Sequence, residues 1–305
     1  MNRYQTVVAL ITACSATLPG TASPRQTPAD AETVVLVGAG DIARCGSKEL
    51  AGAVATARLL DGIEGTVFTL GDHAYDTGSE KNFKDCYEST WGRHKARTRP
   101  SPGNHDYATN NGAPYYQYFG EKAGTDKRGF YSYDLGAWHI VSLNSNVDAD
   151  ARSEQVRWLR DDLKAHPSVC TLAYWHIPVF SSGDHGNNPK MEDVWKALYE
   201  FGADIVLNGH DHDYERFAPQ DPKGKPDATK GIREFVVGTG GGGVYKFGKV
   251  RPNSEVHDNT AYGVLKLTLA PISYEWEFLP AVGRFRDSGS AACVDPGSAP
   301  AGPSR

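Results

Sequence analysis

Short apolar runs and helical patterns alternate along the first part of the chain. Residues 34–37 and 66–70 are apolar, of strand length and rich in β-branched side chains. Between them, Leu50, Val54 and Ala57 recur at the spacing of one helix face. The pattern predicts a strand, a helix and a second strand, which is the βαβ unit of a parallel sheet.

A second helix is predicted directly after Ser153. This serine is a suitable N-cap, and Val156, Leu159 and Leu163 form an apolar stripe on the residues that follow it. A strand, a helix and another strand are then predicted over residues 169–174, 192–201 and 204–207.

The last third of the chain has a different pattern. Residues 234–237, 264–269 and 273–279 read as strands with only turns between them. Strands joined by turns are typical of antiparallel pairing, so a second, antiparallel sheet is predicted here.

Composition limits the number of domains and the kind of partner. A chain of 305 residues with 39% hydrophobic residues has enough apolar material for one large core, and one domain over residues 32–295 is predicted. Residues 296–305 are predicted to be a disordered tail. The net charge of −5 leaves no basic surplus for a phosphate backbone, so polymeric nucleic acid is not expected as a partner.

The N-terminus, residues 1–31, has the pattern of a secretory signal followed by a Pro/Ser/Thr-rich lead. Arg3 precedes an apolar run over residues 6–13, which is far shorter than the roughly 20 residues that cross a bilayer. Cleavage near Ala22 predicts a secreted or periplasmic protein. The alternative is a lipoprotein anchored through Cys14, because residues 11–14 also resemble a lipobox, and only then would the protein contact a membrane.

Four cysteines remain when Cys14 is set aside, an even number that suits an oxidising compartment. The pairing predicted is Cys45 with Cys86 and Cys170 with Cys293. The sequence leaves the other two connectivities open, and also the possibility that some of these cysteines are buried free thiols.

Five short polar blocks follow apolar runs or lie in loops, where an open α/β sheet collects its ligands. They are Gly40-Asp41, Gly71-Asp72-His73-Ala74-Tyr75, Gly103-Asn104-His105-Asp106, Trp175-His176 and Gly209-His210-Asp211-His212. Their carboxylates, imidazoles and amide are ligands suited to a pair of metal ions. Residues two apart on an extended segment point to the same side, so His210 and His212 are predicted to serve adjacent metals. Each block alone is weak evidence, since Gly-Asp and single histidines are common, but their order and residue types together are specific.

These blocks resemble the calcineurin-like metallophosphoesterase superfamily. Gly71-Asp72-x-x-Tyr75 and the run from Gly209 to Arg216, Gly-His-x-His-x-Tyr-Glu-Arg, are similar to its purple acid phosphatase branch. The resemblance covers residues 34–294 and implies a four-layer α/β/β/α sandwich of two mixed sheets flanked by helices. Related phosphodiesterases carry a histidine where this chain has Ala43, and in the purple type Tyr75 replaces that ligand. The alternative for Tyr75 is a packing role beside the loop.

The resemblance also implies the metal ligands and the catalytic residues. One metal takes Asp41, Asp72, Tyr75 and His212; the other takes Asp72, Asn104, His176 and His210; Asp72 bridges them. A tyrosinate suits a trivalent ion, so Fe(III) is expected at the Tyr75 site, with Fe, Zn or Mn at the second. His105 and His185 are expected to bind phosphate and assist the leaving group.

Several residues depart from the family pattern or fall outside it. The first block ends in Ala43 where glycine is usual, Asp106 stands where glutamate is frequent, and Gly186 stands where plant relatives often carry a second histidine. His73 either touches substrate or is structural. The run from Gly238 to Gly243 lacks the Gly-Lys-Ser/Thr of a nucleotide-binding loop and is interpreted as a flexible loop beside the metal site. The remaining histidines are predicted to be structural or solvated; they are His94, His139, His166 and His257.

The predicted function is hydrolysis of small phosphoric monoesters, of the acid or alkaline phosphatase type, by a metal-bound hydroxide at a dinuclear centre. Two alternatives remain open: a phosphodiesterase or phospholipase with the same site, favoured if Ala43 and Gly186 widen the cleft, and a non-catalytic exported metal-binding protein. The sequence does not predict the oligomeric state.

Overall fold

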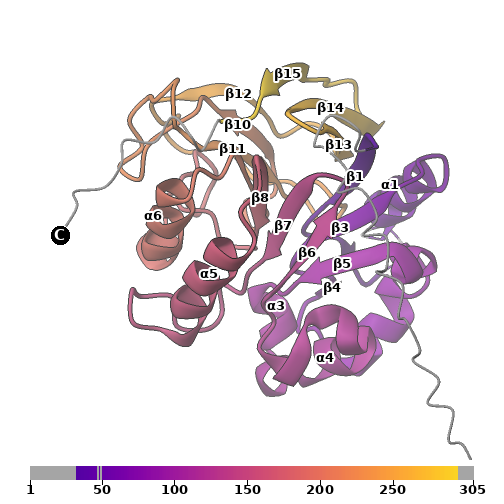
Figure 1. Ribbon diagram of the computed structural model, residues 1–305. Coiled ribbons are helices and arrows are strands. Elements are labelled where there is room, and N and C mark those ends of the chain that lie inside the picture. The colour runs from indigo at the N-terminus through magenta and orange to yellow at the C-terminus, as the bar shows by residue number, and fades with distance from the viewer. Residues whose placement is uncertain (1–31, 47, 49, 295–305) are drawn as a thin grey trace, which may run out of the picture.

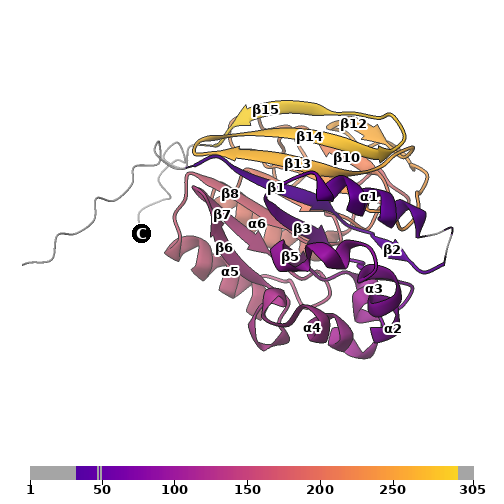
Figure 2. The same ribbon diagram turned by 90° about the vertical axis from the view of Figure 1, so that its right-hand side faces the viewer.

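The computed structural model describes residues 32–46, 48 and 50–294. Two mixed sheets stack face to face, as Figure 1 and Figure 2 show from two directions. The first sheet has the order β15 (Ser288–Ala292), β14 (Ser273–Val282), β13 (Tyr262–Ala270), β1 (Val34–Ala39), β3 (Thr66–Leu70) and β5 (Thr98–Ser101). The second has the order β12 (Ser254–Asp258), β10 (Tyr214–Phe217), β11 (Arg233–Val237), β9 (Ile205–Asn208), β8 (Cys170–Tyr174), β7 (Trp138–Ser142) and β6 (Tyr131–Leu135).

Helices cover the outer faces of both sheets. Helix α1 (Ala51–Asp61) packs on β13 and β14, while α5 (Glu154–Ala165) and α6 (Glu192–Glu200) pack against each other beside the second sheet (Figure 1). Short helices join β3 to β6; they include α2 (Glu80–Asn82), α3 (Asn104–Tyr107) and α4 (Ala113–Phe119). The predicted four-layer α/β/β/α sandwich of mixed sheets is therefore confirmed.

Local signals account for most of these elements. Ser153 caps α5, because its hydroxyl oxygen accepts a hydrogen bond of 3.2 Å from the backbone N–H of Val156. The predicted stripe of Val156, Leu159 and Leu163 is buried against the second sheet. Burial of such a stripe contributes roughly 1.5 to 3 kcal/mol per large aliphatic side chain, and this fixes the helix to the sheet.

The prediction of a separate antiparallel sheet in the last third is wrong. Strand β13 pairs antiparallel with β1, with Val34 opposite Leu269, so β13, β14 and β15 extend the first sheet. Strand β11 belongs to the second sheet and pairs parallel with β9. An alternating pattern predicts that a strand has one buried face, but it carries no information on which distant strand will be its neighbour.

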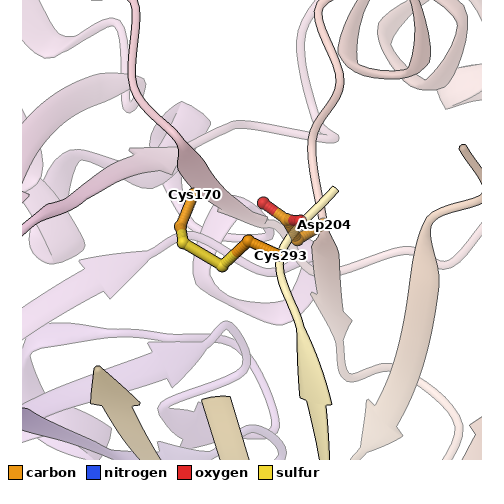
Figure 3. Close-up of side chains that lie close together, drawn as sticks. All are labelled: Cys170, Asp204 and Cys293. Atoms are coloured by element: carbon orange, nitrogen blue, oxygen red, sulfur yellow. A yellow bond between two sulfur atoms is a disulfide. The ribbon is translucent and has the colours of Figure 1, made fainter. Parts of the chain in front are cut away.

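Both predicted disulfides are confirmed. Cys45 is bonded to Cys86, and Cys170 is bonded to Cys293. Figure 3 shows that the second bond joins β8 of the second sheet to the segment that follows β15 of the first, so it ties the two sheets together. Asp204 lies beside it and accepts hydrogen bonds from the backbone N–H groups of Thr171 (2.8 Å) and Val294 (2.5 Å).

This grouping of Cys170, Asp204 and Cys293 has the spacing of a metal site, but its sulfurs are bonded to each other. They therefore cannot act as thiolate ligands. The carboxyl group of Asp204 has a structural role instead. Burial raises the pKa of Asp204 to about 7, against the opposing effect of the two backbone donors.

Two predictions concern terminal residues that lie outside the described part of the chain. These are the signal segment over residues 1–31 with Cys14, and the tail over residues 296–305. Within the part of the chain that is described, every helix is too short or too polar to cross a membrane.

A pair of glutamates lies in the interior of the second sheet. Glu215 on β10 and Glu234 on β11 are both fully buried, and one oxygen of each has no hydrogen-bond partner among the described residues. The other oxygens accept hydrogen bonds from the Ser182 backbone N–H (2.7 Å) and from the Gln220 side chain (3.3 Å). Burial, and next the charge of Glu215, raise the pKa of Glu234 well above its usual range.

We therefore expect Glu234→Gln to stabilise the protein at neutral pH. Above pH 4.5 the unfolded glutamate ionises while the folded one keeps its proton, so folding takes up a proton and the wild type loses stability as pH rises. Glutamine removes this cost. We expect its free energy of unfolding to exceed that of the wild type by about 1 to 3 kcal/mol at pH 7, and this difference should vanish near pH 4.

Urea unfolding of both proteins at the two pH values measures this difference. Glu121→Gln is the matched control, because Glu121 is exposed and should give no gain at either pH. A loss of stability in Glu234→Gln at pH 7 would mean that Glu234 is ionised in the folded protein.

Candidate metal centre

The chemistry-bearing blocks meet at the carboxyl ends of the strands. Asp41 follows β1, Asp72 follows β3, His176 follows β8, and His210 and His212 follow β9. Asn104 is the first residue of α3, directly after β5. Ligands of open α/β sheets gather at this edge, so strands that are far apart in the sequence bring these side chains together.

The backbone around the carboxylates is held in an unusual conformation. Asp41, Asp72 and His210 have φ angles of 60°, 50° and 74°, values that residues other than glycine rarely adopt. Gly103 and Gly209 allow the close approach of neighbouring segments, since a Cβ atom at these positions would lie 2.1 Å from Asp72 Oδ1 and 2.6 Å from Asp41 Oδ2. A side chain at either glycine would clash with a neighbouring aspartate, so glycine is required at both positions.

A first set of four donor atoms consists of the Tyr75 hydroxyl oxygen and three atoms around it. The hydroxyl oxygen lies 2.8 Å from Asp41 Oδ1, 3.1 Å from Asp72 Oδ2 and 2.9 Å from His212 Nε2. His212 Nε2 also lies 3.3 Å from Asp41 Oδ1. All four residues are almost completely buried.

A second set of four donors shares one atom with the first. His176 Nε2 lies 2.9 Å from Asn104 Oδ1, 3.3 Å from Asp72 Oδ2 and 3.2 Å from His210 Nδ1. The shared atom is Oδ2 of Asp72, while its other oxygen accepts a hydrogen bond of 2.8 Å from the His105 backbone N–H. A single carboxylate oxygen therefore lies between the two sets.

These distances fit two metal ions. With metal–donor bonds of about 2.1 Å, donors at neighbouring corners of an octahedron lie about 3.0 Å apart, and those of a tetrahedron about 3.4 Å apart. The seven separations given above fall between 2.8 and 3.3 Å. The donors also have the right chemistry, since carboxylate, phenolate, amide and imidazole groups all bind hard or borderline ions.

The orientation of His176 supports the same interpretation. Its Nδ1–H donates to the backbone carbonyl of Leu70 at 2.6 Å, so in the neutral ring Nε2 carries a lone pair. That lone pair faces another acceptor, the amide oxygen of Asn104, at 2.9 Å. With the amide oxygen in this orientation, the two acceptors need a proton or a metal ion between them.

Burial by itself lowers the pKa of His176, but the charge of Asp72 and the hydrogen bond to it raise that pKa to about 10. His176 must therefore lose a proton before its Nε2 can bind a metal. His210 differs, because burial and the charges of His176 and His185 lower its pKa to about 3 and keep it neutral.

Tyr75 holds its proton in the absence of a metal. Burial, and then the carboxylates of Asp41 and Asp72, raise its pKa well above the usual range. Only a strong Lewis acid could displace that proton near neutrality. The hydroxyl contacts donors of the first set on three sides, which is more than the alternative of a packing tyrosine requires.

His105 and His185 lie beside the donor sets, the first near Asp72 and the second against His210. His105 Nδ1 hydrogen-bonds to the carbonyl of Asp76, and its Nε2 lies 3.9 Å from Asp72 Oδ2. The ring of His185 stacks on that of His210 with centroids 4.1 Å apart. Both side chains are partly exposed, so each can reach a molecule bound at the centre.

Asp211 contacts a predicted site residue, His185, although the sequence predicted no role for it. The backbone N–H and the Nδ1–H of His185 both donate to Asp211 Oδ1 at 2.9 Å, and the Ser181 hydroxyl donates to Oδ2. The hydrogen bond to Asp211 is the main cause that raises the pKa of His185. Its place between His210 and His212 was a signal, but the sequence does not show that it faces away from the metals.

His210 and His212 do not lie on an extended segment, so that part of the prediction is wrong. His210 has a φ of 74° and lies in a bend. The two imidazoles nevertheless reach different donor sets, because the turn at His210 directs its ring toward His176.

His73 does not reach a substrate. Its ring is fully buried and hydrogen-bonds to Thr69 (2.7 Å) and to Asp106 (2.8 Å). Asp106 also accepts a hydrogen bond of 2.8 Å from the Gly103 backbone N–H. The aspartate that departs from the family pattern thus connects two of the blocks.

The other histidines lie outside the centre. His94 hydrogen-bonds to the carbonyl of Ala57, and His139 lies between Asp134 and Asp162 and stacks on His166. His257 is on β12, and its ring lies against that of Phe247.

The glycine run lies beside the centre, as predicted, but it is packed instead of flexible. Gly240 N–H donates to the carbonyl of Gly40 (2.9 Å), and Gly242 N–H donates to that of Asp41 (2.7 Å). Both glycines are buried. The run therefore braces the loop that carries Asp41.

The fold and the donor sets together define a metallophosphoesterase. The model of the calcineurin-like phosphoesterase family matches residues 34–214, more than half of the chain, and the protein therefore belongs to this family.

Its relatives include purple acid phosphatases, which confirms the predicted resemblance. Purple acid phosphatase 18 of Arabidopsis thaliana is 32% identical over 127 residues, covering 40% of this chain and 29% of the relative. Probable inactive purple acid phosphatase 1 of the same plant is 23% identical over 257 residues, covering 70% of this chain and 41% of the relative. The chain spans less than half the length of these two relatives.

The solved structures agree on the fold. A purple acid phosphatase from yellow lupin (Lupinus luteus) seeds superposes with a TM-score of 0.71 at 19% identity, covering 87% of this chain and 55% of that one.

Proposed function

We propose that the protein is a phosphoric monoester hydrolase that uses two metal ions. The proposal rests on one observation, the two four-donor sets that share Oδ2 of Asp72. Bound ions would hold the phosphoryl oxygens and lower the pKa of a water molecule so that it can attack phosphorus. We assign the metal ligands as Asp41, Asp72, Tyr75, Asn104, His176, His210 and His212.

Two histidines would complete the reaction. His105 is oriented by its bond to the Asp76 carbonyl, which directs Nε2 toward the centre. Asp211 orients His185 in the same way, through Nδ1. We assign to both side chains a hydrogen bond to phosphate, and protonation of the leaving oxygen to one of them.

The donors support a proposal for the identity of each metal. We propose Fe(III) in the set that contains Tyr75, because its phenol needs a strong Lewis acid to ionise. The second set, with an amide and two imidazoles, suits Fe, Zn or Mn.

The diesterase alternative depended on a wider cleft at Ala43 and Gly186. Ala43 is fully buried in β2 (Ala43–Arg44), which pairs with β4 (Ala74–Tyr75), so it opens no space. The space next to Gly186 contains the guanidinium of Arg251. Neither position favours a larger, diester substrate.

The non-catalytic alternative is weakened by the intact donor sets. Some relatives carry the name "probable inactive", so family membership alone does not decide the activity. In this chain, however, His105 and His185 also flank the donors, and a protein that only bound metal would have no need of them.

We further propose export to an oxidising compartment, as a secreted or periplasmic protein with one catalytic domain over residues 32–295. Two disulfides in the described residues support this.

We expect purified, metal-replete protein to hydrolyse p-nitrophenyl phosphate with a kcat/KM at least about tenfold above that for bis(p-nitrophenyl) phosphate. The ratio compares two esters with the same leaving group, so it measures the preference for a monoester. A ratio below one would keep the metal centre and assign the protein to the diesterases; no hydrolysis of either ester would support the non-catalytic alternative.

A further inference from the structure

A segment after the glycine run forms one wall of the centre. We call residues 243–253 the rim loop. Its Tyr245 stacks on the ring of His212 with centroids 3.9 Å apart and planes at 10°. The centroid of the Tyr245 ring also lies 5.5 Å from that of the His185 ring. The Tyr245 backbone N–H donates to the carbonyl of His212 at 3.1 Å. The rim loop is therefore fixed to a proposed ligand.

The far end of the rim loop is fixed to the segment that carries His185. The Gly248 backbone N–H donates to the Ser182 carbonyl (2.8 Å), and that of Arg251 donates to the Ser182 hydroxyl oxygen (2.8 Å). The Arg251 side chain adds a bond of 3.1 Å from Nε to the carbonyl of Ser181. This last bond sets the direction of the guanidinium.

The guanidinium lies next to Gly186, the residue that follows His185. A Cβ atom on Gly186 would lie 3.0 Å from Nη2 of Arg251, so Arg251 lies where a side chain at position 186 would begin. Gly186 has a φ of 69°, which favours glycine. Where plant relatives often place a second histidine, this chain therefore has an arginine from another segment.

The two terminal nitrogens of Arg251 are available. Among the described residues, its side chain forms only the bond from Nε and lies within ion-pair distance of no carboxylate. The rim loop carries three basic residues, Lys246, Lys249 and Arg251, and no acidic one, although the whole chain has a net charge of −5. Arginine binds phosphate in a bidentate manner, and a positive rim favours an anion.

We propose that Arg251 is a specificity-determining residue that binds a second phosphoryl group in the leaving group of the substrate. This inference rests on the proposed phosphoester hydrolysis. The substrate class is a compound with a second phosphate beside the scissile one, such as a nucleoside diphosphate. Water then forms a bond to the terminal phosphorus and releases a proton to solvent, while the bridging P–O bond of the phosphoanhydride breaks. The products are inorganic phosphate and the nucleoside monophosphate, whose one remaining phosphate is the group bound to Arg251.

The test compares ADP, whose leaving group carries a phosphate, with p-nitrophenyl phosphate, whose leaving group has none. We expect Arg251→Gln to lower kcat/KM for ADP by about tenfold or more, through loss of a charge-assisted contact, and to change that for p-nitrophenyl phosphate by less than about twofold. In the wild type, the preference for ADP should fall as salt concentration rises, and in the variant it should not.

Arg152→Gln is the matched control, because Arg152 is exposed and its side chain has no partner among the described residues. It should leave both substrates and the salt dependence unchanged. If the Arg251 variant has the melting temperature and metal content of the wild type, its lower activity comes from the lost contact and not from a damaged fold. An equal loss on both substrates, or no loss on either, would overturn the inference while the proposed function stands. Failure of the wild type to hydrolyse p-nitrophenyl phosphate would overturn the proposed function itself.

Discussion

Asp72→Asn should lower kcat for p-nitrophenyl phosphate by about a thousandfold or more and reduce the bound metal from two ions per chain. Oδ2 of Asp72 is the one atom common to both donor sets, so its charge would compensate both proposed ions at once. Asparagine keeps the shape but removes the charge, and if its nitrogen takes that place no lone pair faces the metals. Loss of a single preorganised group in an active site already costs about 10² to 10³ in kcat.

The metal content of the purified variant, measured by elemental analysis, is compared with its kcat. His166→Ala is the control, since His166 lies at the end of α5 against His139 and should leave both quantities unchanged. The fold should survive, because Asp72 is held by the His105 backbone N–H as well, and asparagine can still accept that bond. A variant with two bound ions and wild-type turnover would rule out the bridging role.

The site was predictable from sequence to the extent that its chemistry lies in local blocks. Every proposed ligand except Tyr75, which lies in β4, follows a strand or begins a helix, and the carboxyl ends of parallel strands converge by topology. Asp41, Asp72 and His176 could therefore be assigned to one site from the sequence, without any measured distance. The residue types restricted the interpretation to metal chemistry, and the family resemblance supplied the division into two sets.

Residues that act on the site from outside the blocks were not predictable. Tyr245 and Arg251 belong to a segment with no regular hydrophobic pattern. The position of Tyr245 depends on its bond to the His212 carbonyl, and that of Arg251 on bonds to Ser181 and Ser182. Asp211 was visible in the sequence, but whether it faces the metals or His185 is decided by the bend at His210.

The same division holds for the fold. Helix α5 and strand β3 follow from capping, periodicity and β-branched content, which are properties of neighbouring residues. The pairing of β13 with β1 joins residues more than 200 positions apart and depends on which sheet edge is free when the core closes. The local hydrophobic pattern of β13 does not show which sheet edge will be free.

Removing the disulfide that joins the sheets should destabilise the protein more than removing the other one. Cys170–Cys293 spans 123 residues and Cys45–Cys86 spans 41. The loss of chain entropy in the unfolded state then stabilises the fold by about 5 and about 4 kcal/mol respectively. The first bond also holds Val294, whose backbone N–H donates to Asp204, so its loss should weaken the attachment of the last strand.

Two double variants test this, Cys170→Ala with Cys293→Ala and Cys45→Ala with Cys86→Ala. Each pair should lower the free energy of unfolding in urea, the first by about 1 kcal/mol more than the second. Alanine is chosen because Cys86 and Cys170 are buried, and a serine hydroxyl there would add a cost of its own. If the Cys45 and Cys86 variant proves the less stable, loop entropy does not set the order of stability of the two variants. The difference would then come from the contacts of Cys45 with Asn82 and the Tyr75 carbonyl, which support the segment that bears Tyr75.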